Sequence, residues 1–373
     1  MLVLSPPASH PAQILASKVA VWCSLCTQAA SNVGTKNQSH TRAIYTDDRS
    51  STISAAMARR VAILAACAHA LQPKLPTRTP STRRSTMRMA WNDAATCKVC
   101  FVRHGQSEWN AKNLFTGWAD VPLTILGKNE AAAGATWIWK EGLEFDVAYT
   151  SELKRAQQTL ALVMDITGQD DLTVHKSWRL NERMYGALQG LNKKETVMKY
   201  GDDQVQLWRR SFDTPPPQCV LDSEYWPGND NKYAHVPEED VPRSECLKDT
   251  IDRTLPYWDG AIVPALKRGK TVLIAAHGNS IRGMVKALDN IGDSEIVGLE
   301  IPTGVPLLYH LDADLKPLKD PRSFGLLSGA FLGDPEEIKA AQEKVAAQTK
   351  VEDTSVESEE EGKKRILEEA RGA

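Results

Sequence analysis

Two histidines, each followed by glycine, stand at the ends of apolar runs that are typical of buried strands. His104 ends the run 98–104, and His277 ends the run 271–277. The carboxyl ends of parallel strands lie at one edge of a sheet, where ligands bind, so we expect the two imidazoles to face each other across a pocket. Glycine after each histidine would let backbone or ligand approach closely.

These residue types suit the transfer of an anionic group such as phosphoryl. A neutral imidazole is a nucleophile near pH 7 without a base to activate it, which favours His104 for that role. Arginine presents a fork of donors that fits phosphate oxygens, and Arg103 directly precedes this histidine. His277 would stabilise the same group as a donor or as a cation.

Longer motifs surround both histidines. They read RHGQSEWN at 103–110, LFTGWADVPL at 114–123, TSELKRAQQT at 150–159, SWRLNERMYG at 177–186, RRSFDTPPP at 209–217, AAHGNSIRGMVK at 275–286 and IPTGVPLLY at 301–309. Together, over about 97–350, they closely resemble the cofactor-dependent phosphoglycerate mutases of the histidine phosphatase superfamily. The resemblance implies an α/β fold, a three-layer α/β/α sandwich with a mostly parallel central sheet.

The resemblance also assigns roles near the histidines. It implies that His104 becomes phosphohistidine and that Arg155, within 150–159, joins Arg103 as a bidentate phosphate ligand. The acid/base glutamate of the family falls on Glu182, and a carboxylate beside an anionic substrate should have a raised pKa. The family often has histidine where this chain has Met184. With two arginines and two histidines around the phosphoryl group, we expect no metal.

A phosphoglycerate carries a carboxylate and a phosphate, so the site needs a second basic cluster away from the nucleophile. Residues that match the family positions for that end are Tyr185, Lys193, Arg209 and Arg210. Further polar and backbone contacts are implied at Asn110, Thr116, Gly117, Gly278 and Asn279, with Ser107 as an additional contact.

The expected function is therefore an isomerase that interconverts 3-phosphoglycerate and 2-phosphoglycerate in glycolysis or gluconeogenesis, with 2,3-bisphosphoglycerate as the phosphoryl primer. One alternative is a bisphosphoglycerate synthase or phosphatase of the same superfamily. Another is a non-catalytic relative that binds phosphorylated metabolites, although no catalytic group is missing.

Alternating strands and helices position these residues. We expect strands at 98–104, 145–149 and 271–277, with 306–311 as the last strand. We expect helices after Thr124 (with Ala131, Ala135 and Ile138 on its apolar face), at 152–166, at 249–266 interrupted by Pro256 and Pro264, at 279–288 and at 335–348. The proline-rich segment 214–242 predicts a long surface loop over the site.

The chain divides into a leader at 1–95, a catalytic domain at 96–334 and a C-terminal helix with an acidic tail at 335–373. From Met57 the leader has a basic start, an apolar stretch and an Ala-x-Ala site, followed by an acid-free segment rich in arginine and serine. This layout is typical of a signal followed by a transit peptide and predicts a plastid protein. A mitochondrial presequence or a cytoplasmic protein are the alternatives.

Composition narrows the possible partners. The net charge of −2 argues against a nucleic-acid binder, and no run is long enough to span a bilayer, so we expect no membrane partner for the mature form. Seven cysteines, only two of them after residue 100, favour a reducing compartment. Cys97 and Cys100 have the spacing of a metal or redox pair, but Cys100 is expected in the core. Small phosphoglycerates are the expected ligands, and relatives suggest a homo-oligomer, either a dimer or a tetramer.

Overall fold

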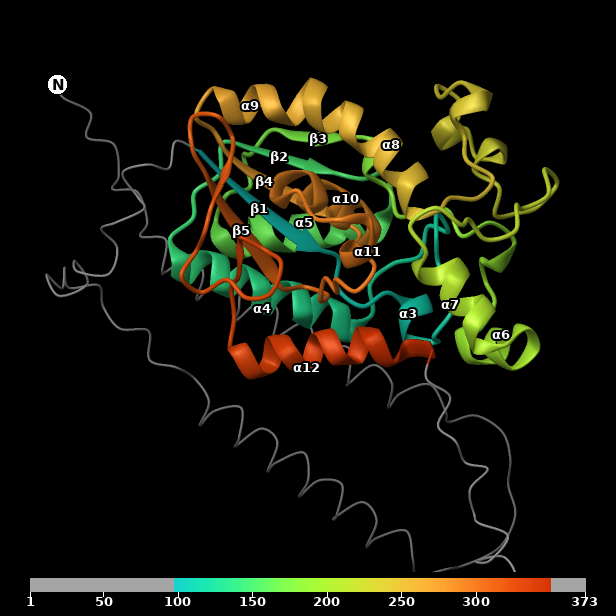
Figure 1. Ribbon diagram of the computed structural model, residues 1–373. Helices are drawn as coiled ribbons and strands as arrows, with labels where there is room; N and C mark the ends of the chain where they lie inside the picture. Colours follow the sequence, from blue (N-terminus) through green and yellow to red (C-terminus); the bar gives the residue numbers. More distant parts are fainter. Residues whose placement is uncertain (1–96, 350–373) are drawn as a thin grey trace, which may run out of the picture. The chain divides into compact units, whose positions relative to one another are not determined.

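A seven-stranded mixed sheet runs through residues 97–349, which are the residues that the computed structural model describes (Figure 1). Its strands are β1 (Cys97–Arg103), β2 (Val147–Thr150), β3 (Val174–Lys176), β4 (Thr271–Ala276), β5 (Pro306–Leu311), β6 (Pro317–Leu318) and β7 (Ala330–Phe331). They are ordered β3-β2-β4-β1-β5-β6, and β7 also pairs with β5. The predicted leader at 1–95 and the acidic tail after 350 lie outside the described residues.

Four neighbouring strands of the sheet are parallel. β1 pairs with β4, and β2 pairs with both β3 and β4, all in parallel register. β5 is antiparallel to β1, and β6 and β7 are antiparallel to β5, which makes the sheet mixed. The prediction that 306–311 is the last strand is wrong, because β6 and β7 follow it. Each has only two residues, too few to show an alternating pattern.

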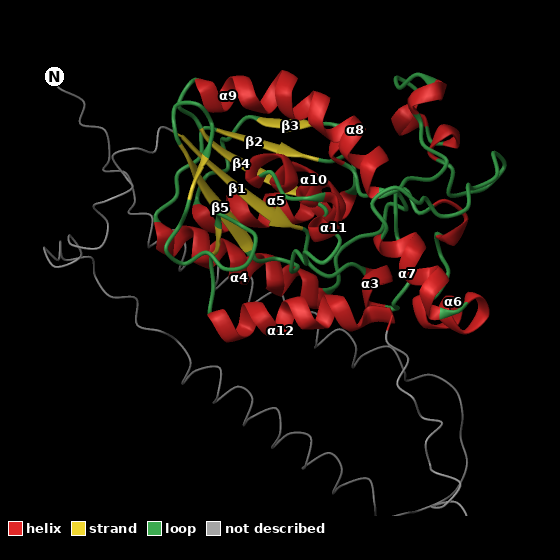
Figure 2. Cartoon of the chain, viewed as in Figure 1, coloured by secondary structure: helices red, strands yellow, loops and turns green. Residues whose placement is uncertain are grey.

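Helices cover both faces of the sheet, which confirms the three-layer α/β/α sandwich (Figure 2). On one face lie α4 (Ile125–Glu141) and α5 (Lys154–Thr167), and on the other lie α8 (Leu247–Tyr257), α9 (Val263–Lys267) and α10 (Gly278–Asp289). Thr124 caps α4 as predicted, and Ala131, Ala135 and Ile138 are fully buried. Because successive residues of a strand point to opposite faces, Cys97 and Cys100 of β1 enter different core clusters. The two thiols therefore do not form a shared metal site.

The predicted helix 249–266 is divided in an unexpected way. Pro256 lies inside α8 without ending it, and a π-helical segment, Trp258–Ile262, connects α8 to α9. A proline lacks the amide hydrogen that the helix ladder needs, and a π-type turn is one way to accommodate the change. Trp258 and Ile262 of this segment remain buried in the main core.

Smaller helices lie beyond the carboxyl ends of β1 and β4 (Figure 1). They are α3 (Glu108–Ala111), α6 (Lys193–Tyr200), α7 (Asp202–Arg210) and α11 (Asp293–Ile296). The last α-helix of the described chain is α12 (Pro335–Ala346), which continues into a 3-10 turn, Ala347–Thr349. Short 3-10 turns lie at Trp178–Leu180, Gly186–Leu188, Pro227–Asn229, Asn231–Tyr233 and Glu238–Asp240. In the described part of the chain, no helix is long and apolar enough to cross a membrane.

The segment 214–242 is more than a surface loop. Its side chains Cys219, Tyr233 and Val236 are buried in a separate apolar cluster with Trp118 and Trp178. Each of the two tryptophans belongs to one of the motifs noted in the sequence. The segment is therefore held against the site by its own small core rather than by regular secondary structure.

Candidate active site

A narrow cavity of about 70 Å³ opens at the carboxyl ends of β1 and β4. Residues from eight or more separate segments line it, so no single element defines the site. The lining residues are Arg103, His104, Asn110, Leu114, Thr116, Gly117, Arg155, Glu182, Tyr185, Lys193, Arg209, Arg210, Gly278, Asn279, Arg282, Glu300, Ile301, Val345 and Gln348.

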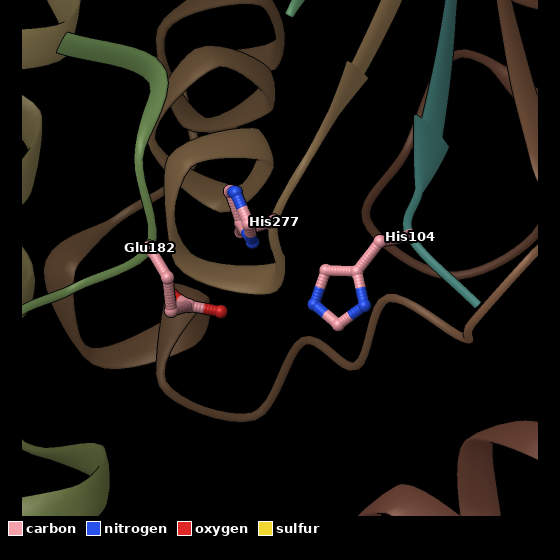
Figure 3. A group of neighbouring side chains, drawn as sticks. All are labelled: His104, Glu182 and His277. Atoms are coloured by element: carbon pink, nitrogen blue, oxygen red, sulfur yellow. The ribbon is translucent and has the colours of Figure 1, made fainter. Parts of the chain in front are cut away.

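The two histidines meet at one sheet edge, as the strand pattern predicted. His104 follows β1 and His277 follows β4, and the parallel register places Arg103 opposite Ala276. The imidazole centroids are 4.9 Å apart, and both side chains are almost completely buried. The carboxyl group of Glu182 is directed toward the two rings (Figure 3).

Hydrogen bonds fix which nitrogen of His104 can react. Nδ1 lies 2.7 Å from the carbonyl oxygen of Gly105 and so carries the hydrogen that it donates there. Nε2 then has a free lone pair, toward which the Nε–H of Arg155 points at 3.3 Å. Burial, followed by the positive charges of Arg155 and Arg103, lowers the pKa of His104 well below its ordinary value. The ring is therefore neutral at pH 7, with Nε2 as the nucleophilic atom.

His277 is held from behind by a residue that the sequence analysis did not single out. Ser151, which follows β2, lies with its Oγ 2.7 Å from His277 Nε2, and that oxygen also accepts a hydrogen bond from the amide of Leu153. When the hydroxyl donates to Nε2, the hydrogen of the neutral ring sits on Nδ1, which has no partner among the described residues. Burial, followed by the charge of Arg155, lowers the pKa of His277 far below its ordinary value. The free ring thus acts as a neutral donor rather than as a cation.

Arg155 is oriented differently from the bidentate phosphate ligand that was expected. Its Nη1 donates to the carbonyl of Ala119 at 2.9 Å, and its Nη2 donates to that of Gly117 at 2.7 Å. These two carbonyls lie in a loop that has no strand partner there, so the guanidinium donates the hydrogen bonds that they need. Only Nε faces His104 directly, although each terminal nitrogen keeps a second hydrogen. Arg103 donates to the carbonyl of Ile301, and its Nε is buried without a partner among the described residues.

Glu182 is buried but strongly hydrogen-bonded. One carboxylate oxygen accepts from the amide of Arg183 at 2.8 Å and from both the amide and the side chain of Asn279, at 3.2 and 2.8 Å. Burial is the largest single effect and would raise its pKa. The charge of Arg103 and these hydrogen bonds together outweigh burial and lower the pKa. The predicted raised pKa concerns a carboxylate beside an anionic substrate and stays a prediction, whereas in the ligand-free site hydrogen bonds stabilise the charged form.

The second basic cluster lies at the other end of the same cavity. It contains Lys193 at the start of α6 and Arg209 and Arg210 at the end of α7, with Arg282 of α10 close by. Burial and the neighbouring guanidinium groups, that of Arg209 above all, lower the pKa of Lys193 to about 7. Four cationic side chains converge there, which is the environment that an anionic group requires.

Arg210 is partly neutralised. Its guanidinium forms an ion pair with Glu300, and both side chains line the cavity. The adjacent Arg209 points elsewhere, as expected for consecutive helical residues, and donates to the carbonyl of Val345 at 3.1 Å. The two consecutive arginines therefore have different surroundings.

The structure brings most of the predicted site residues together. Every one of them lines the cavity except His277, which lies directly behind it against His104, and Ser107. The Ser107 hydroxyl accepts a hydrogen bond from the amide of Asn110 and caps α3, which gives it a structural role at the base of the site.

Several residues of the cavity were not identified from the sequence. Arg282 and Ile301 fall within quoted motifs, whereas Leu114 begins one and Glu300 directly precedes one. No motif in the sequence pointed to Gln348. Its Oε1 accepts from Lys193 and from Arg209, each at 3.1 Å, across 155 and 139 residues of sequence.

One group of side chains in the described residues has the composition of a metal site. His104, Glu182 and His277 each present a ligand atom, and these atoms lie within 4.8 Å of one another. A cation placed there would also face Arg155, whose Nε lies 3.3 Å from His104 Nε2. The like charge of that guanidinium opposes cation binding, so the expectation of a metal-free site stays a prediction supported by electrostatics.

The chain is similar to several proteins of known structure. Among solved structures, the chain is similar to a mycobacterial glucosyl-3-phosphoglycerate phosphatase, with 21% identity, a TM-score of 0.44, and coverage of 57% of this chain and 92% of that chain. It is also similar to the alpha-ribazole phosphatase from Shigella flexneri, with 19% identity, a TM-score of 0.44, and coverage of 64% and 98%. A third similar structure is YhfR of Bacillus stearothermophilus, with 19% identity, a TM-score of 0.45, and coverage of 59% of this chain and 94% of that chain.

A family model adds to these comparisons. Residues 99–225 match the family described as the histidine phosphatase superfamily, branch 1. The matched residues include His104, Arg155 and Glu182, which all line the cavity. Over these residues the chain is similar to the histidine phosphatase superfamily.

Proposed function

We propose that this protein is a phosphoglycerate mutase that interconverts 3-phosphoglycerate and 2-phosphoglycerate through a phosphohistidine at His104. The observation that carries the proposal is the two-ended cavity. One end has the neutral imidazole and Arg155, and the other has Lys193 and Arg209. A superfamily phosphatase needs to hold only one phosphoryl group, whereas a mutase must also hold the carboxylate and the second oxygen of its substrate.

The charge of the cavity fits such a ligand. Six cationic side chains line it, and two carboxylates, Glu182 and Glu300, oppose them. A phosphoglycerate carries a phosphate dianion and a carboxylate at pH 7, and a bisphosphoglycerate carries still more negative charge. The same residues therefore fit 2,3-bisphosphoglycerate, which supplies the first phosphoryl group to His104.

Each transfer exchanges one bond for another. The phosphohistidine gives its phosphoryl group to the free hydroxyl of the bound monophosphate; the N–P bond breaks, an O–P bond forms, and Glu182 accepts the hydroxyl proton. After the bisphosphorylated intermediate reorients, His104 Nε2 takes the other phosphoryl group. Glu182 then returns the proton to the oxygen that is released.

The environment of Glu182 suits both directions of this proton transfer. In the free site its carboxylate is ionised, because Arg103 and three hydrogen bonds favour the charge. A bound phosphate brings negative charge next to it and raises its pKa, so the carboxyl can hold the proton while the intermediate reorients. His277 Nδ1 and Arg155 Nε stabilise the phosphoryl oxygens during transfer.

The test measures phosphoenzyme formation and turnover in one preparation. Labelled 2,3-bisphosphoglycerate should label the wild-type protein, and 3-phosphoglycerate turnover should depend on that primer and resist EDTA. His104→Ala should abolish both, because the neighbouring His277 has its Nε2 bound to Ser151 and its hydrogen on Nδ1, so neither of its nitrogens replaces His104 Nε2. The matched control is His175→Ala on the exposed β3, which should leave both unchanged.

Two outcomes would contradict the proposal. Labelling that persists in His104→Ala would place the phosphoenzyme elsewhere. Release of inorganic phosphate from 2,3-bisphosphoglycerate that is faster than isomerisation of 3-phosphoglycerate would favour the bisphosphoglycerate phosphatase instead.

A further inference from the structure

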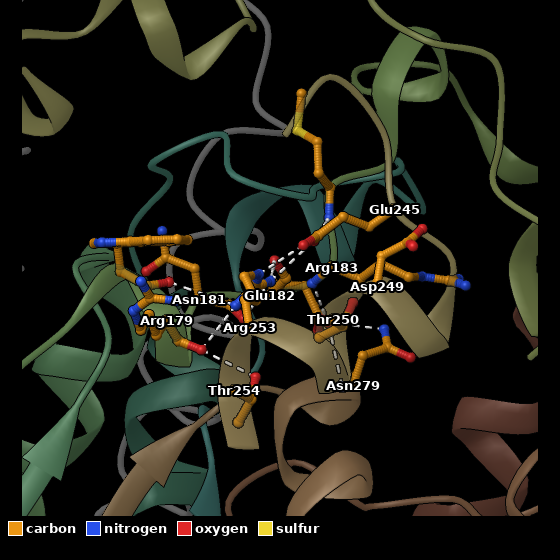
Figure 4. Close-up of polar contacts among 12 residues, drawn as sticks. Arg179, Asn181, Glu182, Arg183, Glu245, Asp249, Thr250, Arg253, Thr254 and Asn279 are labelled. Atoms are coloured by element: carbon orange, nitrogen blue, oxygen red, sulfur yellow. Dashed lines mark hydrogen bonds and ion pairs between the residues drawn. The ribbon is translucent and has the colours of Figure 1, made fainter. Parts of the chain in front are cut away.

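We infer that Arg253 and Glu245 form a positioning pair that fixes the backbone of the segment carrying Glu182, and thereby sets where that carboxyl group meets the substrate. The inference rests on the proposed function, because it concerns the proton-transfer step. Neither residue lines the cavity, so the pair acts through Glu182 and not on the ligand. Figure 4 shows Arg253, which belongs to α8, and Glu245 beside Asn181 and Glu182 of the segment.

The segment that carries Glu182 has little regular structure of its own. It connects two short 3-10 turns, Trp178–Leu180 and Gly186–Leu188, and has no partner strand. Its peptide carbonyls therefore need hydrogen bonds from elsewhere, because they are buried.

One guanidinium supplies most of those bonds. Arg253 donates to the carbonyl of Arg179 at 2.8 Å, to that of Asn181 at 3.1 Å and to that of Glu182 at 2.9 Å. The carbonyl of Glu182 also accepts from the indole of Trp118 at 2.6 Å. A single side chain thus holds three carbonyls within four residues of sequence.

Glu245 binds the same guanidinium group and fixes its orientation. Its carboxylate accepts from Arg253 Nε at 2.6 Å and from Nη2 at 2.9 Å, a bidentate pair that fixes the plane of the guanidinium. The same carboxylate accepts from the amide of Met184 at 2.8 Å, and the amide of Glu245 donates to the carbonyl of Met184. The peptide groups before and after Arg183 are therefore held by the two members of one ion pair.

The two ends of Glu182 are held by two helices that contact each other. Its carbonyl is bound by Arg253 of α8, and its carboxylate is bound by Asn279 at the start of α10. The helices approach closely at Gly283, where an added Cβ would lie 2.9 Å from Ile251 of α8. The position of the carboxyl group relative to His277, the residue before α10, is therefore set by packing in the core.

The test separates proton transfer from phosphoryl transfer by choice of substrate. A phosphoglycerate releases an alkoxide-like oxygen that needs a proton, whereas p-nitrophenyl phosphate releases a stable phenolate that does not. Glu245→Gln should reduce kcat with 3-phosphoglycerate by about 10- to 100-fold, the loss expected when a catalytic group is misplaced by about 1 Å. Its KM, and the rate of the nitrophenolate burst that accompanies phosphorylation of His104, should change less than about twofold.

Three further variants sharpen the assignment. Glu182→Gln should give the same pattern, and the double variant Glu182→Gln/Glu245→Gln should lose no more than Glu182→Gln alone, because the pair acts through that residue. Asp252→Asn is the control, since it removes a carboxylate of α8 from an exposed ion pair with Lys248. It should leave both substrates unaffected.

Arg253→Lys provides an independent measurement. It keeps the charge beside Glu245 but loses the fork that binds three carbonyls, so it should reproduce the selective loss of kcat. Parallel slowing of both substrates, or multiplicative losses in the double variant, would overturn the inference. Failure of both Glu245→Gln and Arg253→Lys to fold would also reject it, because the pair would then serve the fold itself.

The outcomes also distinguish this inference from the proposed function. If the wild-type protein forms no phosphoenzyme, or if Glu182→Gln has no effect, the proposed function fails. If Glu182→Gln slows turnover and Glu245→Gln does not, only the positioning role fails.

Discussion

Individual side chains of this site work at pKa values that burial has shifted. The neutral state of His104 makes Nε2 available, and it follows from burial and two neighbouring guanidinium groups. Lys193 is affected in the same way, with a pKa lowered to about 7. A lysine whose pKa lies near 7 takes up a proton when an anion binds beside it, because the negative charge of the anion favours the ammonium form.

Substrate binding should therefore depend on the protonation of Lys193. Below about pH 7 the ammonium group of Lys193 is already formed, so KM should not change with pH. Above about pH 7 the free site loses this proton, which the bound anion requires. KM should therefore rise by up to about tenfold per pH unit. The measurement is KM for 3-phosphoglycerate between pH 7 and 9, where the substrate phosphate is fully ionised. Lys193→Arg stays charged and should have a flat profile. A wild-type profile that is flat as well would contradict the shift.

At the scale of elements, the loop after β1 depends on close contact with the start of α4. A Cβ added at Gly105 would lie 2.0 Å from the carbonyl oxygen of Gly127, and one added at Gly127 would lie 2.0 Å from the carbonyl oxygen of Gln106. Two glycines thus let the helix pack directly on the backbone that follows His104. No larger residue fits without moving that backbone.

Gly127→Ala should consequently destabilise the protein and displace His104. Overpacking of this kind costs about 1–3 kcal/mol, and it opposes the usual benefit of alanine in a helix. Thermal unfolding should show a Tm lowered by about 2–10 °C, together with slower phosphoenzyme formation. The control is Gly260→Ala, where an added Cβ meets nothing within 4 Å. Equal effects of the two substitutions would contradict the packing argument.

At the scale of the whole molecule, a residue near the end of the described chain contacts residues of the site that are far away in the sequence. Asn113 donates to the backbone carbonyl of Gln348 across 235 residues, and the Gln348 side chain accepts from Lys193 and Arg209. In the ligand-free cavity a neutral amide thus contacts two of the cations that are proposed to bind the substrate. The 3-10 turn that follows α12 is therefore part of the wall of the site together with Val345 of α12, and α12 also packs on the core through Ile338.

Gln348→Glu should convert this contact into competition with the substrate. A carboxylate at that position would form ion pairs with Lys193 and Arg209, so KM for 3-phosphoglycerate should rise about tenfold, which corresponds to about 1.4 kcal/mol. kcat should change little, because the reacting groups lie at the other end of the cavity. Gln218→Glu, an exposed residue outside the lining, controls for the added charge. An unchanged KM in Gln348→Glu would show that the ligand does not use these cations.

Local patterns were sufficient to predict the elements that carry the chemistry. The apolar runs at 98–104 and 271–277 became β1 and β4, and their parallel pairing follows from the alternation of strands and helices. The facing histidines could therefore be predicted. β6, β7 and the π-helical segment after Pro256 could not, because each arises from tertiary packing of only a few residues. The leader, its plastid destination and the oligomeric state stay predictions.

The sequence by itself determined which residue types could do chemistry: two histidines at strand ends, the arginines around them and the glutamate in a long motif. Only the tertiary structure decided how those groups are held. It turned the Arg155 fork toward the loop carbonyls and lowered the pKa of Glu182. It also brought Gln348 to the cavity and Arg253 to the backbone of the segment that carries Glu182. Residue type and spacing along a strand are local properties, whereas burial, charge neighbours and hydrogen-bond partners depend on segments that meet only when the chain folds.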